Sequence, residues 1–142
     1  MTNSPAVQKA LVDLIARAPA FATRQVTISH PGKLAEPECV FVDSVTVAEQ
    51  PRSLGKQYRR EEITVSLGLV VEVNADDAQD ALDRAYRMFT DTETVIGETP
   101  NLGLTNVLFA QISSWEQKNF FGDGKRIVEM TVDVSVTANK EN

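Results

Sequence analysis

The residues best suited to nucleophilic or acid–base chemistry are few in this 142-residue chain. His30 is the only histidine and Cys39 is the only cysteine. A Ser-His-Asp set would need His30, yet its position between Ser29 and Pro31 is typical of a turn, and the chain contains no GxSxG motif. Cys39 begins an apolar stretch without a basic neighbour that would lower its pKa, so we interpret it as a small buried hydrophobe.

Metal and phosphate chemistry is no better supported. A zinc site needs three or four ligands, which one histidine and one cysteine do not supply. A group of aspartates at near-helical spacing lacks the glycine and terminal glutamate of a calcium loop, and a solvated helix face explains it: Asp76, Asp77, Asp80 and Asp83. The run from Gly122 to Lys125 lacks the spacing of a phosphate loop and predicts a hairpin turn. We therefore expect no catalytic residue, no cofactor, no metal and no enzymatic activity.

One segment has the composition of a contact site for another molecule. Residues 49–60, EQPRSLGKQYRR, are interpreted as a polar loop, and they form the most basic stretch of an acidic chain. An acidic protein surface or a nucleic acid would suit these charges, and an ordinary solvated loop is the alternative. We define this candidate intermolecular contact, the basic segment, by five residues: Arg52, Lys56, Tyr58, Arg59 and Arg60.

Composition excludes several broad classes of protein. The hydrophobic share of 42% and the charged share of 24% are those of an ordinary globular domain. No apolar run approaches the roughly 18 residues of a membrane helix, so no membrane partner is expected. The net charge of −6 argues against a broad phosphate-binding face. We expect one domain over residues 1–142, without a signal peptide and made in the reducing cytoplasm.

The element that must organise the fold is a strand from Arg60 to Asn74. Apolar residues occupy every second position, which predicts a half-buried strand: Ile63, Val65, Leu67, Leu69, Val71 and Val73. The opposite face carries mostly polar residues and is expected to meet water or a partner. Such one-sided burial is typical of an antiparallel sheet.

Apolar residues at three- and four-residue spacing predict two amphipathic helices. The first is capped by Asn3 or Ser4 and ends at Pro19. The second follows Asp76 or Asp77 and has one apolar stripe: Ala78, Ala81, Leu82, Ala85, Phe89, Thr92 and Ile96. Residues 97–106 are expected to form a loop in which Leu102 and Leu104 turn inward.

Four further strands complete the prediction, over residues 25–29, 39–47, 107–118 and 126–138. The second of these has a mixed pattern that predicts either a bulge near Asp43-Ser44 or burial on both faces. Residues 138–142 are expected to fray. The predicted fold class is α+β, with a twisted, mainly antiparallel sheet and both helices packed on one face.

Nearly the whole chain resembles the tail terminator (gpU-like, tail-to-head joining) proteins of long-tailed bacteriophages. The resemblance is carried by Ala10 to Leu14, Arg60 to Val65, Ala78 to Phe89, Pro100 to Gly103 and the final strand. The family implies a subunit of a homohexameric ring that caps the tail tube, ends its elongation and joins it to the head. The implied partners are other copies of the chain, the tail tube protein and the head–tail connector, and the implied location is the head-proximal end of the virion tail. DNA would pass through the lumen without specific binding, which suits an acidic subunit.

Two alternatives remain open at this point. The chain is either another neck or tail-tube structural protein of such a virion, or a small non-viral α+β module that binds a ligand between helix and sheet. A single capping ring would distinguish a terminator from a tube protein, which stacks repeatedly. A monomer with a closed apolar pocket would favour the ligand-binding module.

Overall fold

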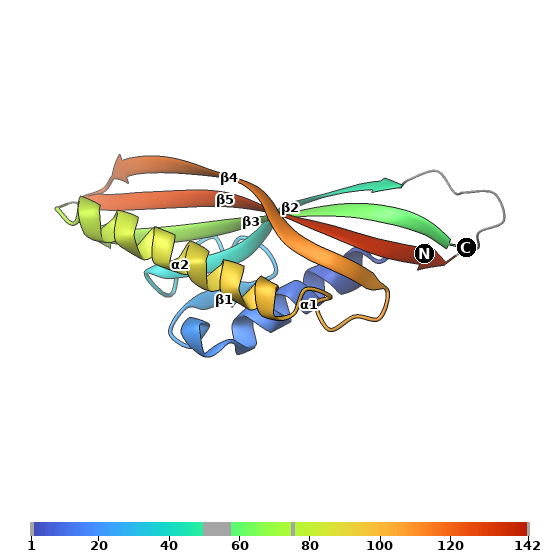
Figure 1. Ribbon diagram of the computed structural model, residues 1–142. Coiled ribbons are helices and arrows are strands. Elements are labelled where there is room, and N and C mark those ends of the chain that lie inside the picture. The colour runs from blue at the N-terminus through green and yellow to red at the C-terminus, as the bar shows by residue number, and fades with distance from the viewer. Residues whose placement is uncertain (1, 50–57, 75, 142) are drawn as a thin grey trace.

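The computed structural model describes residues 2–49, 58–74 and 76–141. They form a five-stranded sheet in the order β1-β2-β3-β5-β4, with both long helices on one face of it (Figure 1). The elements are α1 (Ser4–Arg17), a short 3-10 helix (Pro19–Phe21), β1 (Gln25–Thr27), β2 (Glu38–Glu49), β3 (Tyr58–Asn74), α2 (Ala78–Glu98), β4 (Val107–Gly122) and β5 (Lys125–Glu141). The predicted α+β class and element order are confirmed.

The sheet is antiparallel except at one edge. Strand β1 pairs in parallel with β2 through three residues, whereas β2, β3, β5 and β4 pair antiparallel. Strands β3 and β5 pair along their whole length, from Tyr58 opposite Glu141 to Asn74 opposite Lys125. Strands β4 and β5 are joined by Asp123 and Gly124, whose φ angles of 52° and 71° fit the two-residue turn that Asp-Gly favours.

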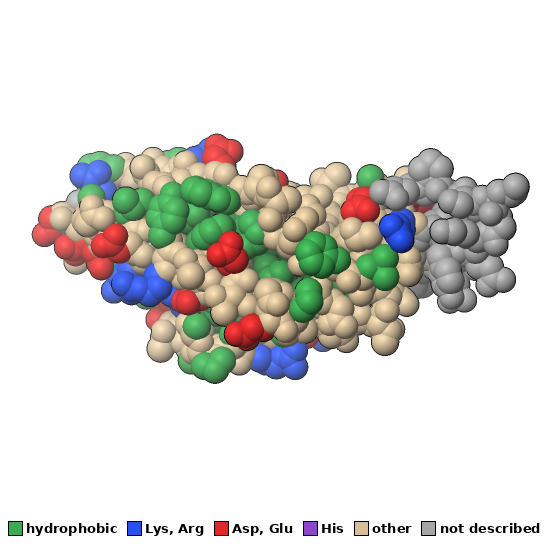
Figure 2. Space-filling model, viewed as in Figure 1, with side chains coloured by type: hydrophobic (Ala, Val, Ile, Leu, Met, Phe, Trp, Pro, Cys, Tyr) green, Lys and Arg blue, Asp and Glu red, His purple; other side chains and the backbone are tan. Residues whose placement is uncertain are grey.

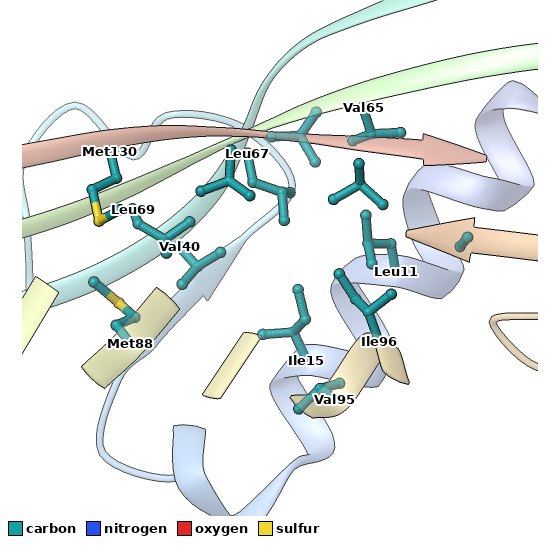
Figure 3. Packing of buried hydrophobic residues seen from close by; sticks show 14 of the residues in the cluster. Leu11, Ile15, Val40, Val65, Leu67, Leu69, Met88, Val95, Ile96 and Met130 are labelled. Carbon is teal, nitrogen blue, oxygen red and sulfur yellow. The ribbon is translucent and has the colours of Figure 1, made fainter. Parts of the chain in front are cut away.

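The core lies between the helices and one face of the sheet. The inward residues of β3 from Ile63 to Val71 are fully buried, as predicted, and Val73 is half-buried. Leu11 and Ile15 of α1 and Ile96 of α2 point into the same space below the strands (Figure 3). Leu102 is buried and Leu104 is half-buried, which confirms the inward turn of that loop.

The apolar stripe of α2 differs in part from the prediction. Met88 and Val95 are buried although the predicted stripe omitted them, whereas Ala78 is exposed. The helix continues to Glu98, so its final turn presents Val95 and Ile96 together to the core. Neither Asn3 nor Asp77, the residues that precede the two helices, makes a side-chain capping hydrogen bond.

The outer face of the sheet is covered at one end, so the first half of β2 is buried on both faces, which is the alternative that its mixed pattern predicted. Cys39, Phe41 and Val70 form a second buried cluster, with Leu34 and Ile127 packed against it and the His30 ring in contact with Phe41. Gly68 lies under the Phe41 ring, and a Cβ atom at Gly68 would come within 2.4 Å of that ring. The alternating pattern of β3 placed Val70 correctly on the outer face, but it did not predict that other residues bury Val70 there.

Several strand ends lie beyond their predicted limits. The bulge in β2 is confirmed, as the register with β3 shifts between Val42 and Ser44. Strand β3 begins at Tyr58 and not at Arg60, and β5 runs to Glu141 through residues that were predicted to fray. Each extension supplies the hydrogen-bonding partner of the other, so the two ends are ordered as one ladder.

Candidate intermolecular surface

His30 and Cys39, the two residues best suited to nucleophilic or acid–base chemistry, both lie near Phe41 on the outer face of the sheet. His30 lies in the irregular segment after β1, where its Nδ1 accepts a hydrogen bond from the Gly32 N–H (2.8 Å) and its ring meets the Phe41 ring at 4.6 Å. Cys39 is buried on the outer face, and burial raises the pKa of its thiol to about 11 despite a hydrogen bond with Thr27. The prediction that Cys39 is a small buried hydrophobe is confirmed, whereas His30 lies in irregular chain next to a bend.

The aspartates before and along α2 lie on the solvent side of the helix, as predicted. Within the described ranges, no three or more His, Cys, Asp or Glu side chains are arranged to hold a metal ion. Among the same residues, no helix is both long and apolar enough to cross a membrane.

Only part of the basic segment lies within the described residues. Arg52 and Lys56 lie outside the described residues. Tyr58, Arg59 and Arg60 belong to β3 and not to a loop, which corrects the prediction. The cause is the added length of β5, because Asn139 pairs with Arg60 and the next two residues extend that ladder. The Arg60 side chain is exposed.

The same end of the molecule contains a buried carboxylate that the sequence analysis did not identify. Glu61 is fully buried, and its Oε1 accepts hydrogen bonds from the Asn3 backbone N–H (2.8 Å) and the Asn3 side-chain amide (2.9 Å). The Thr2 hydroxyl donates to Oε2 of the same carboxylate. The Asn3 amide also reaches the backbone oxygen of Asn139 at 2.9 Å. These contacts join the start of α1 to β3 and β5, near the two chain termini (Figure 1).

Strand β4 has an unusually apolar exposed surface. Several of its large side chains are between 44% and 65% exposed: Leu108, Phe109, Trp115, Phe120 and Phe121. Trp115 meets the rings of Tyr86 (5.6 Å) and Phe89 (5.4 Å) of α2, so part of this surface continues onto the helix. Hydrophobic side chains gather in a patch on the side of the molecule where β4 and α2 lie (Figure 2). Exposed apolar patches of this kind mark contact sites.

Both edges of the sheet are open along a considerable length. Strand β4 pairs only with β5 in the described chain. Strand β2 pairs with β1 only at residues 39–41, so no described strand covers the outer edge of residues 43–48. Open edges present unpaired backbone N–H and C=O groups, which recruit other strands.

The outer face between these edges is polar. Asp133 of β5 accepts hydrogen bonds from the Ser66 hydroxyl (2.5 Å) on one side and the Ser114 hydroxyl (3.1 Å) on the other. The Thr137 hydroxyl donates to Glu62 at 3.0 Å. This face therefore combines short hydroxyl side chains with fixed carboxylates, as the alternation of β3 and β5 predicted.

Comparison with known proteins found a similar fold. No protein-family model and no curated protein matches the chain. Among solved structures, a chain from the virion of the native gene transfer agent (GTA) particle is similar, with a TM-score of 0.54 and 9% sequence identity. The similarity covers 95% of this chain and 97% of that chain. At this identity the similarity shows a shared fold, and a function has to be argued separately.

Proposed function

We propose that the protein is a structural component of a phage-type virion, and specifically a tail terminator. In this role it forms a homohexameric ring that caps the tail tube, ends its elongation and joins it to the head connector. The observation that carries the proposal is the end-to-end similarity of fold to a virion chain of a gene transfer agent. The family resemblance of the sequence adds the terminator role.

The surface of the subunit supports an assembling protein. Among the described residues, no strand covers the outer edge of β4 or of residues 43–48 of β2, and β4 carries five exposed large hydrophobic side chains, divided between the two faces of the sheet. A monomer in solution would expose these groups to nonspecific association, whereas a ring would bury them. Core side chains of the helices pack against the inward face of β3. A cavity of about 350 Å³ lies between the start of α2 and the end of the sheet near the β4–β5 turn, lined by residues such as Leu82, Phe120 and Val128, and it is where the alternative ligand-binding module would hold a ligand.

The acidic character supports a ring through which DNA passes. Each copy carries a net charge of −6, and the helix-free face of the sheet presents Asp133, Glu62 and Glu129 among hydroxyl groups. Like-charge repulsion would keep a duplex from adhering to such a wall. DNA therefore passes without specific binding in this proposal.

The basic segment contacts an acidic surface of a neighbouring subunit, the tube or the connector. Strand β3 begins at Tyr58, at the far end of the molecule from the β4–β5 turn (Figure 1), and the exposed side chain of Arg60 is available there to contact another chain. Opposite charges across an interface guide assembly and fix its orientation.

Two measurements test the proposal. Light scattering of the purified chain should detect a discrete ring, and a monomer at every concentration would refute it. In cells that produce the particle, removal of the chain should give tails of uncontrolled length without heads by electron microscopy. Tails of normal length lacking only head attachment would favour a neck protein, and failure to build any tube would favour a tube protein.

A further inference from the structure

We infer that the free edge of β2 in one copy pairs antiparallel with the free edge of β4 in the next copy, so that the sheets of the ring join into one continuous sheet. The inference rests on the proposed ring and names the surface that closes it. The pairing residues are 45–48 of β2 and 109–112 of β4.

The open segments of β2 and β4 are in register with each other across the sheet. Pairing partners form a straight row across four strands, from Thr46 through Thr64 and Ser135 to Gln111. The neighbouring rows likewise join Val45 to Ile112, Val47 to Ala110 and Ala48 to Phe109. Register is uninterrupted across this window, because the irregularities of β2 and β4 lie outside it.

Strand direction allows the sheet to continue from copy to copy. Strands β2, β3, β5 and β4 alternate in direction, so β2 and β4 run in opposite directions. A second copy placed beside β4 in the same orientation therefore presents its β2 antiparallel to that edge. This contact joins two different surfaces of the chain, and such a head-to-tail interface produces a ring when the rotation from copy to copy closes.

Side-chain facing and hydrogen-bond alternation also agree. Residues in one row share a face of the sheet, and the outward-pointing backbone groups of an antiparallel sheet alternate along each strand. Three successive antiparallel pairings separate Thr46 from Gln111. The backbone N–H and C=O groups of these two residues therefore both point away from the sheet at its edges or both point toward the neighbouring strand. Placing Thr46 of one copy opposite Gln111 of the next, or shifting by two residues, therefore preserves both alternations.

The chemistry of the two edges matches. Residues 44–48, SVTVA, contain no charge and no proline, and neither do residues 107–115, VLFAQISSW. Charged residues, prolines and short strands are the usual means of protecting an edge that stays in water. Val47 and Phe109 are 41% and 47% exposed, so pairing would cover apolar side chains as well as backbone groups.

Disulfide cross-linking tests the contact directly. Within one chain, Thr46 and Gln111 lie three strand spacings apart, about 14 Å, which is too far for a disulfide. In the proposed interface their Cα atoms would lie roughly 4.5–5.5 Å apart, within disulfide range. The double variant Thr46→Cys/Gln111→Cys should therefore give a covalent ladder on a non-reducing gel, ending at the ring number. The native Cys39 is buried. The wild-type chain, which contains only this cysteine, measures the background level of cross-linking.

Matched controls separate the possible contacts. Thr46→Cys alone, Gln111→Cys alone and Thr46→Cys/Asn119→Cys should give no ladder, since Asn119 lies in the other half of β4. Covalent dimers from either single variant would reveal a two-fold contact of like edges and overturn the inference. Wild-type rings without a ladder, even with Ser44→Cys or Ala48→Cys in place of Thr46→Cys, would also overturn it while leaving the ring function intact. A wild-type chain that never leaves the monomeric state would overturn the proposed function and this inference together.

Discussion

Glu61 and Asn3 are joined by two hydrogen bonds to a single carboxylate oxygen, although 58 residues separate them in the sequence. The Asn3 backbone N–H donates one bond and its side-chain amide donates the other. Because Glu61 is fully buried, the carboxylate depends on these donors and on the Thr2 hydroxyl in place of water. The start of α1 is thereby fixed to the central strand.

Replacing this carboxylate should loosen the start of α1. Glu61→Ala leaves the Asn3 donors without their acceptor, so we expect the free energy of unfolding to fall by about 1–3 kcal/mol in urea melts. Glu61→Gln keeps one oxygen acceptor and should lose less. Glu36→Ala, at an exposed glutamate, is the matched control and should leave stability nearly unchanged. Identical melts for Glu61→Ala and the wild type would show that the contact contributes no stability.

The inward face of β3 should dominate stability. Leu67 is fully buried between the sheet and the helices, so Leu67→Ala should lower the free energy of unfolding by about 2–5 kcal/mol. Thr64→Ala, on the outer face of the same strand, should change it by less than about 0.5 kcal/mol. Thermal and urea unfolding of the two variants measure the difference. Equal effects would mean that the two faces contribute alike.

Gly68 is required by the ring of Phe41. A methyl group at Gly68 would overlap that ring, so Gly68→Ala should destabilise the chain by about 1–3 kcal/mol. Phe41→Leu removes the obstructing ring, and the double variant should lose less than the sum of the two single losses. A double-mutant cycle from urea melts provides the coupling energy. Additive losses would show that the two residues do not interact.

The sequence predicted those features that are encoded locally. Alternation identified the inward residues of β3, and the Asp-Gly pair identified the β4–β5 turn. Contacts between distant segments were not predicted. Arg24 donates hydrogen bonds to Glu38 (2.9 Å) and Asp91 (2.6 Å), and the second partner is 67 residues away. No periodicity reports such a pairing, because it depends on which surfaces meet after the helices pack on the sheet.

The residues of the candidate intermolecular surface were likewise predictable only where a local pattern encodes them. Glu61 occupies an inward position of the alternating strand, so the alternation predicts its burial. Because Glu61 is charged, the residue type alone suggests an exposed position. The apolar side chains of β4 were visible as residues, but their exposure was not. It follows from the position of β4 at the sheet edge, which depends on the strand order.

Cys39 should make stability depend on alkaline pH. Burial raises the pKa of the folded thiol to about 11 from 9.0, so the unfolded chain loses this proton first as the pH rises. Stability from this group is complete below about pH 9 and falls between pH 9 and 11, with a slope of up to about 1.4 kcal/mol per pH unit. Urea melts of the wild type and Cys39→Ala across this range should therefore converge. Parallel pH profiles would show that the thiol titrates normally.

The basic segment should act through its charge. Reversing two of its residues, Arg59→Glu together with Arg60→Glu, should leave the chain folded by circular dichroism but weaken ring formation or tail joining. The loss should be greater at low salt than at high salt, because added ions screen both the native attraction and the introduced repulsion. Lys33→Glu with Arg87→Glu makes the same change in net charge at two exposed residues elsewhere and is the matched control. Light scattering across a salt series measures both pairs. If the control weakens assembly equally, net charge alone is responsible, and if neither pair does, the basic segment is an ordinary solvated part of the surface.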